Sequence, residues 1–185
     1  MISTNDMRPG QTLDLDGNLF TIVNYQHVKP GKGQAFVKTK LKNIRSGAVV
    51  DRTFRADEKV NLAVLDKREM QFLYAEDAGL VFMDNETFDQ VHIDPDLLGE
   101  GRKFLKDGTV CVVPTYEGTP VGAEMPLSVE VEIVDTEPGM KGDRVAGALK
   151  PATVETDAVV QVPLFLDKGD RIKVDTRTGE YLSRA

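Results

Sequence analysis

The sequence predicts an all-β protein made of three small barrels, and three observations predict it. Short segments rich in β-branched and aromatic residues recur along almost the whole chain of 185 residues. Gly and Pro turn residues separate these segments evenly, which favours small barrels over a parallel sheet. The net charge changes from +4 over residues 1–63 to −8 over residues 64–126 and −3 over residues 127–185. We therefore expect domain boundaries near these charge breaks, with neighbouring units packed on one another.

The expected strands have the composition of half-buried sheet. They span residues 19–28, 35–44, 48–55, 70–74, 80–84, 88–93, 110–113, 129–134, 158–166 and 171–175. Asp16-Gly17 and Arg45-Ser46-Gly47 have the composition of tight turns between strands. One helix is expected at residues 97–105, because Asp94 can cap it and Pro95 suits its first turn.

Composition excludes several classes of protein. Apolar residues make up 41% of the chain and charged residues 29%, which is ordinary for a soluble globular protein. No apolar run approaches the roughly 18 residues that cross a bilayer. The first residues lack the basic and apolar stretches of a signal peptide. A single cysteine, Cys111, cannot form an internal disulfide. We therefore expect a cytoplasmic protein that does not bind membranes.

The sequence contains no motif of a catalytic or metal site. A P-loop and a Gly-x-Ser-x-Gly elbow are both missing. Cys111 lies in an apolar segment, which favours a packing role over a nucleophile. His27 and His92 are too few for a zinc centre and are interpreted as structural. The carboxylates of residues 64–126 lack metal-loop spacing, so a solvated acidic face is expected. We expect no enzyme, no cofactor and no metal.

A local basic stripe contrasts with the formal net charge of −7. Residues 29–59 carry 9 basic and 3 acidic side chains. Because side chains alternate along a strand, Phe36, Lys38, Lys40 and Lys42 should share one face. The opposite face should carry Val37, Thr39, Leu41 and Asn43. Such a stripe on an acidic protein suggests that one face meets a polyanion. A solvated β-surface would explain the charge equally well.

The loop Lys29-Pro30-Gly31-Lys32-Gly33 joins two long expected strands, so it should form a hairpin tip. Pro30 fixes one backbone angle and restricts the residue before it. Gly31 and Gly33 permit positive φ and leave no side chains around Lys32. The loop would hold a lysine at the end of an arm, where another molecule can approach closely. An ordinary solvent-exposed turn is the alternative interpretation.

Several parts of the sequence resemble bacterial translation elongation factor P. Residues 28–37, Val-Lys-Pro-Gly-Lys-Gly-Gln-Ala-Phe-Val, resemble the tip of that family's first domain. Residues 46–54 resemble its next strand pair, and Tyr74 with residues 82–84 resembles its second domain. The C-terminal segments resemble the family signature, at residues 150–156, 162–165 and 169–182. The resemblance covers the whole chain.

The resemblance implies a fold and a function. The fold would be an SH3-like (KOW-like) barrel at residues 1–63, an OB-type barrel at residues 64–126 and another at residues 127–185, in an L-shaped, tRNA-like arrangement. The function would be to bind the 70S ribosome between the peptidyl and exit sites. There the factor would stimulate peptide-bond formation at consecutive prolines by positioning peptidyl-tRNA, as a monomer with no catalytic site of its own.

The resemblance also implies roles for particular residues. Lys32 would reach toward the acceptor end of the peptidyl-tRNA, and in many members this lysine receives a post-translational extension from a modifying enzyme. The sequence alone leaves open whether Lys32 is extended, and with what group. Candidates for contact with tRNA and ribosomal RNA are Lys29, Lys38, Lys40, Lys42, Arg45, Arg52, Arg55, Arg177, Tyr181 and Arg184.

Two positions depart from the family's pattern. The loop that meets the exit-site codon is usually Gly-Asp-Thr, and here it is Gly142-Asp143-Arg144. Arg144 could contact RNA by charge or stacking. Asp157 occupies a position that is usually glycine. If that position requires a positive φ, Asp tolerates it better than most other residues.

Three other functions stay open. A general binder of single-stranded nucleic acid would need stacking aromatics, yet aromatics are 6% of the chain and tryptophan is absent. An enzyme with an unrecognised site is disfavoured by the missing motifs. A paralogue of elongation factor P could bind ribosomes and relieve a different stall.

Overall fold

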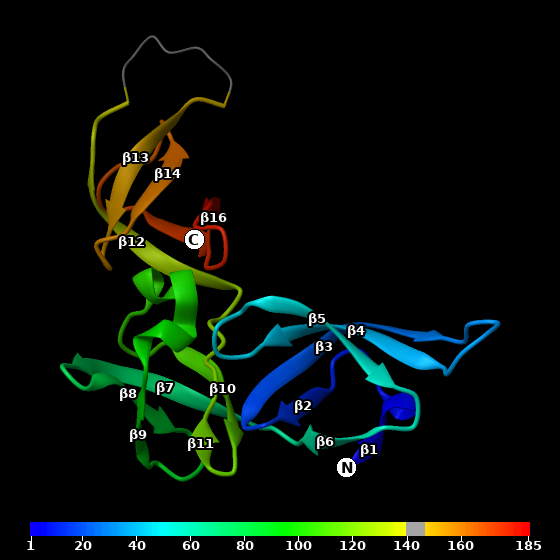
Figure 1. The fold of residues 1–185 in the computed structure, drawn as a ribbon. Coiled ribbons are helices and arrows are strands. Elements are labelled where there is room, and N and C mark those ends of the chain that lie inside the picture. The colour runs from blue at the N-terminus through cyan, green and yellow to red at the C-terminus, as the bar shows by residue number, and fades with distance from the viewer. Residues whose placement is uncertain (140–146) are drawn as a thin grey trace. The chain divides into compact units, whose positions relative to one another are not determined.

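The computed structural model describes residues 1–139 and 147–185, and most of these residues lie in strands (Figure 1). The strands form one six-stranded and two five-stranded sheets, which confirms the all-β prediction. The chain divides into two compact units. One comprises residues 1–67 and 114–122, and the other comprises residues 68–113 and 123–185. No helix in the described part of the chain is long and apolar enough to cross a membrane.

The N-terminal sheet has the strand order β1-β6-β2-β3-β4-β5. Its strands are β1 (Ile2–Ser3), β2 (Thr12–Leu15), β3 (Asn18–Val28), β4 (Phe36–Asn43), β5 (Val49–Arg55) and β6 (Lys59–Ala63), with a 3₁₀ turn, η1 (Thr4–Asp6), after the first. Asp16 and Gly17 both have positive φ, 55° and 83°, and they join β2 to β3 as the expected hairpin turn. Leu13, Ile22 and Leu41 are fully buried in the core of this sheet.

The central sheet has the order β11-β10-β7-β8-β9. Its strands are β7 (Asp66–Glu76), β8 (Gly79–Asp84), β9 (Gln90–Ile93), β10 (Val110–Tyr116) and β11 (Thr119–Pro120). The rings of Phe72 and Phe82 pack in its core with centroids 5.4 Å apart. Aromatic and β-branched residues therefore hold this sheet together, as their spacing predicts.

The expected helix is present in a different form. The segment η2 (Pro95–Phe104) is a pair of 3₁₀ turns, because Gly99 has φ 59° and ψ −144° and interrupts the helical backbone. Asp94 caps it as expected, since its carboxylate accepts the backbone N–H of Asp96 at 3.0 Å. Phe104, at its end, is fully buried in the core of the C-terminal sheet. The segment therefore contributes to two hydrophobic cores, because Leu98 is buried in the core of the central sheet and Phe104 in that of the C-terminal sheet.

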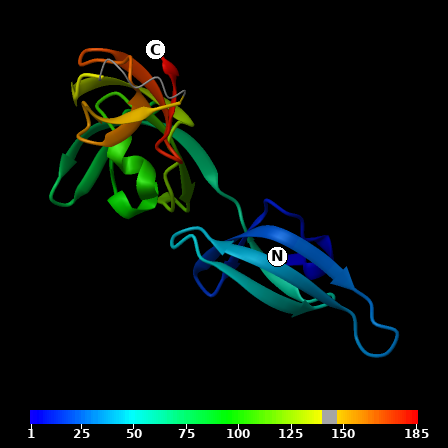
Figure 2. The same cartoon turned by 90° about the horizontal axis from the view of Figure 1, so that it is seen from above.

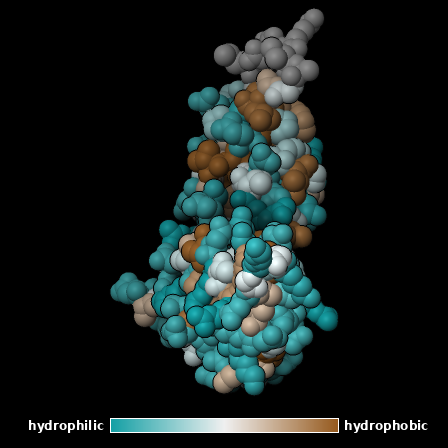
Figure 3. All heavy atoms as spheres, turned by 45° about the vertical axis from the view of Figure 1, so that its right-hand side comes forward, coloured by the Kyte–Doolittle hydropathy of each residue, from teal (hydrophilic) through white to brown (hydrophobic). Residues whose placement is uncertain are grey.

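The C-terminal sheet has the order β14-β13-β12-β15-β16. Its strands are β12 (Ser128–Thr136), β13 (Leu149–Val154), β14 (Val159–Pro163), β15 (Arg171–Asp175) and β16 (Tyr181–Arg184). Alternate residues are buried from Val129 to Ile133 in β12, and Ile172 and Val174 are buried in β15. On the face shown in Figure 3, hydrophobic residues of the C-terminal part form separate groups.

Candidate functional site

The tip loop lies at the end of a long hairpin. Strands β3 and β4 pair from Phe20 and Asn43 to Val28 and Phe36, and the loop extends beyond their last pair (Figures 1 and 2). All residues from 29 to 34 are exposed. The ladder has a register shift between Ile22 and Asn24 and is regular from Asn24 to Val28. It therefore fixes where the loop begins, although the side chains of the loop itself are solvated.

The two glycines of the tip have different conformations. Gly33 has φ +102°, a value that side-chain-bearing residues rarely adopt. Gly31 has no positive φ, so its lack of a side chain is the property that matters at this position. At both positions an added Cβ would meet nothing within 4 Å. Lys32 therefore stands between two positions without side chains, and its ammonium group can approach another molecule closely.

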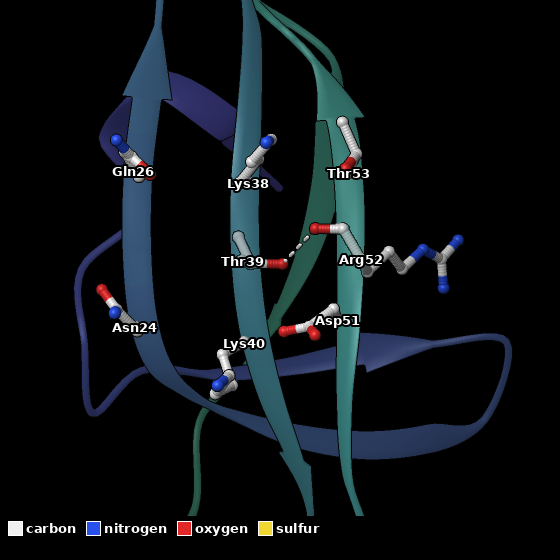
Figure 4. A pocket seen from close by; sticks show the side chains of 8 residues that line it. All are labelled: Asn24, Gln26, Lys38, Thr39, Lys40, Asp51, Arg52 and Thr53. Atoms are coloured by element: carbon white, nitrogen blue, oxygen red, sulfur yellow. Dashed lines mark hydrogen bonds between the residues drawn. The ribbon is translucent and has the colours of Figure 1, made fainter.

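The lysines of β4 share one face, as the alternation predicts. Lys38, Lys40 and Lys42 are exposed, and Val37 and Leu41 on the other face are fully buried. On the exposed side, the register aligns Gln26 with Lys38 and Thr53, and Asn24 with Lys40 and Asp51. These rows, together with Thr39 and Arg52 between them, line a shallow depression of about 390 Å³ (Figure 4). The stripe is thus a polar surface across β3, β4 and β5.

Two residues of the predicted basic stripe lie apart from its face. Arg52 pairs in register with Thr39, on the side of the sheet that faces the core. The Thr39 hydroxyl donates to the Arg52 carbonyl oxygen at 2.8 Å, and the guanidinium lies 5.1 Å from the Phe54 ring centroid. Arg45 lies in the turn between β4 and β5, at the end of the sheet opposite the tip, where Asn43 accepts its backbone N–H. Arg55, by contrast, aligns with Phe36 on the lysine face.

The C-terminal candidates are engaged within their own sheet. The Arg177 guanidinium lies 3.2 Å from the Asp175 carboxylate, and that of Arg184 lies 2.7 Å from Asp170. Tyr181 packs half-buried against the core. A phosphate would have to compete with these carboxylates for both arginines. The loop Gly142-Asp143-Arg144 lies outside the described residues.

The remaining polar candidates form no reactive site. Cys111 is fully buried, and burial raises the pKa of its thiol to about 11, so the packing interpretation fits. His27 and His92 are both exposed, and His92 Nε2 lies 3.3 Å from a Glu76 carboxylate oxygen. Among the described residues, no group of three or more His, Cys, Asp or Glu could hold a metal ion.

Comparison with sequence models of known protein families identifies the family of this chain. Sequence models of three elongation factor P domains match the chain: the KOW-like domain at residues 3–60, the OB domain at residues 65–123 and the C-terminal domain at residues 129–184. The chain belongs to the elongation factor P family. It is therefore a translation factor with KOW-like and OB domains.

Individual elongation factor P sequences are similar to this chain over their full length. The chain is 56% identical to elongation factor P of Acidothermus cellulolyticus over 185 residues, which is 100% of this chain and 99% of the relative. It is 55% identical to elongation factor P of Moorella thermoacetica, covering 100% of both. A solved structure of translation initiation factor 5A from Methanococcus jannaschii shares the fold at 22% identity, with a TM-score of 0.57 over 67% of this chain and 91% of that one.

Proposed function

We propose that the chain binds the 70S ribosome between the peptidyl and exit sites and stimulates peptide-bond formation at consecutive prolines. Lys32 would reach the acceptor end of the peptidyl-tRNA. The observation that carries the proposal is the position of Lys32, which stands exposed between two glycines at the end of the β3–β4 hairpin. A side chain in that position can enter a narrow space that a globular surface could not.

The proposed mechanism requires positioning only. Proline restricts the chain to few conformations and presents a hindered nitrogen, so the reactants are poorly aligned. A factor that holds the tRNA end in place lowers the entropic part of the barrier, and the ribosome's own centre does the chemistry. If better alignment lowers the activation free energy by about 2 to 3 kcal/mol, the rate of peptide-bond formation rises roughly a hundredfold. No acid, base or nucleophile from the factor is needed.

The basic face supplies the RNA contact in this proposal. Lys38, Lys40 and Lys42 would meet tRNA phosphates, with Arg55 on the same face. Binding should weaken as salt rises, because each neutralised phosphate releases counterions.

The factor would act in the cytoplasm as a monomer of three domains, with boundaries near residues 63 and 126. A modifying enzyme would extend Lys32.

Reconstituted translation tests this proposal. Two reporters that differ only by a triple-proline stretch are translated with and without protein purified from its native host. We expect the proline reporter alone to accelerate. If the protein changes the translation rates of both reporters equally, the proposed function is refuted, and a paralogue that relieves a different stall is favoured. The mass of the tip peptide from the same preparation shows whether Lys32 carries an extension.

A further inference from the structure

Strand β5 forms an unprotected end of the N-terminal sheet. Of the strands at the ends of the three described sheets it is the longest, with 7 residues, and the others have 2 to 5. Proteins usually protect such an end with a proline, a bulge or a very short strand. Strand β5 contains no proline, and its register with β4 shows no shift from Val49 to Arg55. Its outer edge is therefore regular enough to template a further strand.

Alternate residues of β5 turn their backbone groups away from β4. Asn43 donates its backbone N–H to the Ala48 carbonyl oxygen at 2.8 Å, just before β5. Ala56 donates its backbone N–H to Ala35 at 3.1 Å, just after β5. Because hydrogen-bonded pairs alternate along an antiparallel ladder, the even-numbered residues of β5 bond to β4. The backbone groups that point outward belong to Val49, Asp51, Thr53 and Arg55.

One end of this outward row is closed by the protein itself. The Thr4 hydroxyl donates to the Arg55 carbonyl oxygen at 2.7 Å, and a Glu58 carboxylate oxygen accepts the Arg55 backbone N–H at 3.1 Å. Among the described residues, none bonds to the outward backbone groups of the other three residues of the row, all of which are exposed. Three N–H and three C=O groups, spaced as in a sheet, are thus available to another strand.

Two side chains beside this row indicate the chemistry of a partner. Val50 lies on the core side of the sheet, opposite Leu41, yet 43% of it is exposed. An aliphatic side chain on an added strand would cover it. Arg52 extends away from β4 (Figure 4), and no carboxylate in the described part of the chain pairs with it. An acidic residue on the added strand would lie directly opposite Arg52, in the type of pair that brings side chains closest.

A second copy of the chain fits this edge poorly. Two antiparallel registers of β5 against itself would use most of the free backbone groups. One register places Asp51 opposite its own counterpart, and the other places Arg52 opposite its own counterpart. Like charges directly opposite one another destabilise a strand pair. The charges at the centre of β5 therefore favour a different protein over self-association.

We propose that β5 binds an extended segment of another protein as an additional antiparallel strand. From its N-terminal end, the segment would present an acidic residue to Arg52, a basic residue to Asp51 and an aliphatic residue to Val50. Backbone hydrogen bonds supply the affinity, and these side-chain pairs supply the selectivity. The inference goes beyond the proposed function and does not depend on it.

The test is a fluorescence anisotropy titration of the full chain against the labelled peptide Thr-Glu-Lys-Val-Thr, whose glutamate would face Arg52. We expect a dissociation constant below about 1 mM. N-methylation of the first, third and fifth peptide residues removes the N–H groups that face β5, and it should abolish binding. N-methylation of the second and fourth residues removes N–H groups that face away, and it should change the constant less than about threefold.

Charge reversal tests the register. Arg52→Glu should weaken binding of this peptide at least about threefold, and a peptide with lysine in place of the glutamate should restore it. Arg8→Glu is the matched control, since Arg8 lies exposed between η1 and β2 in the same unit and should not affect binding. Circular dichroism checks that each variant is folded.

Three results would overturn the inference. The first is no binding of the unmethylated peptide up to about 1 mM. The second is equal binding of the two N-methylated peptides, because pairing along a ladder depends on one set of N–H groups only. The third is an effect of Arg52→Glu that the lysine peptide does not reverse. The assay contains no ribosome, so its outcome is independent of proline rescue.

Discussion

The Lys106 ammonium group donates to the Glu155 carboxylate at 3.1 Å and to the Glu130 carbonyl oxygen at 2.6 Å. Glu155 also accepts the backbone N–H of Glu132 at 3.1 Å. Burial raises the pKa of Glu155, but these hydrogen bonds outweigh it and hold the pKa below its ordinary value. One lysine thus joins the segment after η2 to β12, the central strand of the C-terminal sheet, and to the turn after β13.

Lys106→Met should destabilise the protein by about 1 kcal/mol, because the pair is partly buried and part of a small network. Urea unfolding followed by circular dichroism measures the change. Arg102→Met is the matched control, since Arg102 pairs with Asp96 at 3.3 Å on the open surface and should contribute almost nothing. Equal effects of both substitutions would contradict this account.

Acid should remove a stabilising contribution from Asp84. Its carboxylate accepts the backbone N–H groups of Glu86 and Thr87 and lies 3.1 Å from the Arg68 guanidinium, which together lower its pKa below 3.8. The contribution is therefore complete above pH 3.8 and is lost as the pH falls further through the folded-state pKa. The stability difference between wild type and Asp84→Asn should be largest near neutral pH and shrink below pH 3.8. A difference that is constant down to pH 2.5 would refute this origin.

Asp157 should be a strained position. It has φ 66° in the turn between β13 and β14, where its backbone N–H donates to Val154 at 2.9 Å. Asp157→Gly should raise the melting temperature slightly, and Asp157→Val should lower the stability by about 1 to 2 kcal/mol. Asp135→Val, at an exposed strand position, is the control and should be harmless. Thermal unfolding of the three variants decides the point, and a tolerated Asp157→Val would contradict it.

Cys111 should resist alkylation in the native protein. With a pKa of about 11 in place of 9.0, its thiolate fraction at pH 8 is roughly a hundredfold lower than that of a free thiol, and burial also blocks access. Iodoacetamide labelling followed by mass spectrometry should show slow reaction in buffer and fast reaction in urea. Equal rates in the two conditions would show that the site opens readily.

Local pattern was enough to predict the strands of the candidate site. The alternation in β4 predicted which residues share a face, and Asp16-Gly17 predicted a turn that is present. Six strands were not expected, namely β1, β2, β6, β11, β13 and β16. Most are short, and β13 contains Pro151, which usually argues against a strand. Here β12 pairs with β13 only from Ala152 onward, so the missing N–H of Pro151 breaks no bond with that neighbour.

The candidate site was predicted less completely than the fold. Lys32 and the three lysines of β4 could be found from spacing and resemblance. The positions of Asn24, Gln26 and Asp51 beside those lysines depend on the register between strands, which local pattern does not reveal. The alignment of Arg52 with Thr39, away from the lysine face, also depends on the register.

The most direct test of the central claim is the translation of the triple-proline reporter with a Lys32→Ala variant, expressed in the native host. We expect an unchanged unfolding curve, since the exposed tip buries nothing, together with loss of the proline-specific acceleration. Lys29→Ala, which removes a lysine from the same loop, should retain most of the acceleration. Full acceleration by Lys32→Ala would contradict the claim that the tip lysine carries the function.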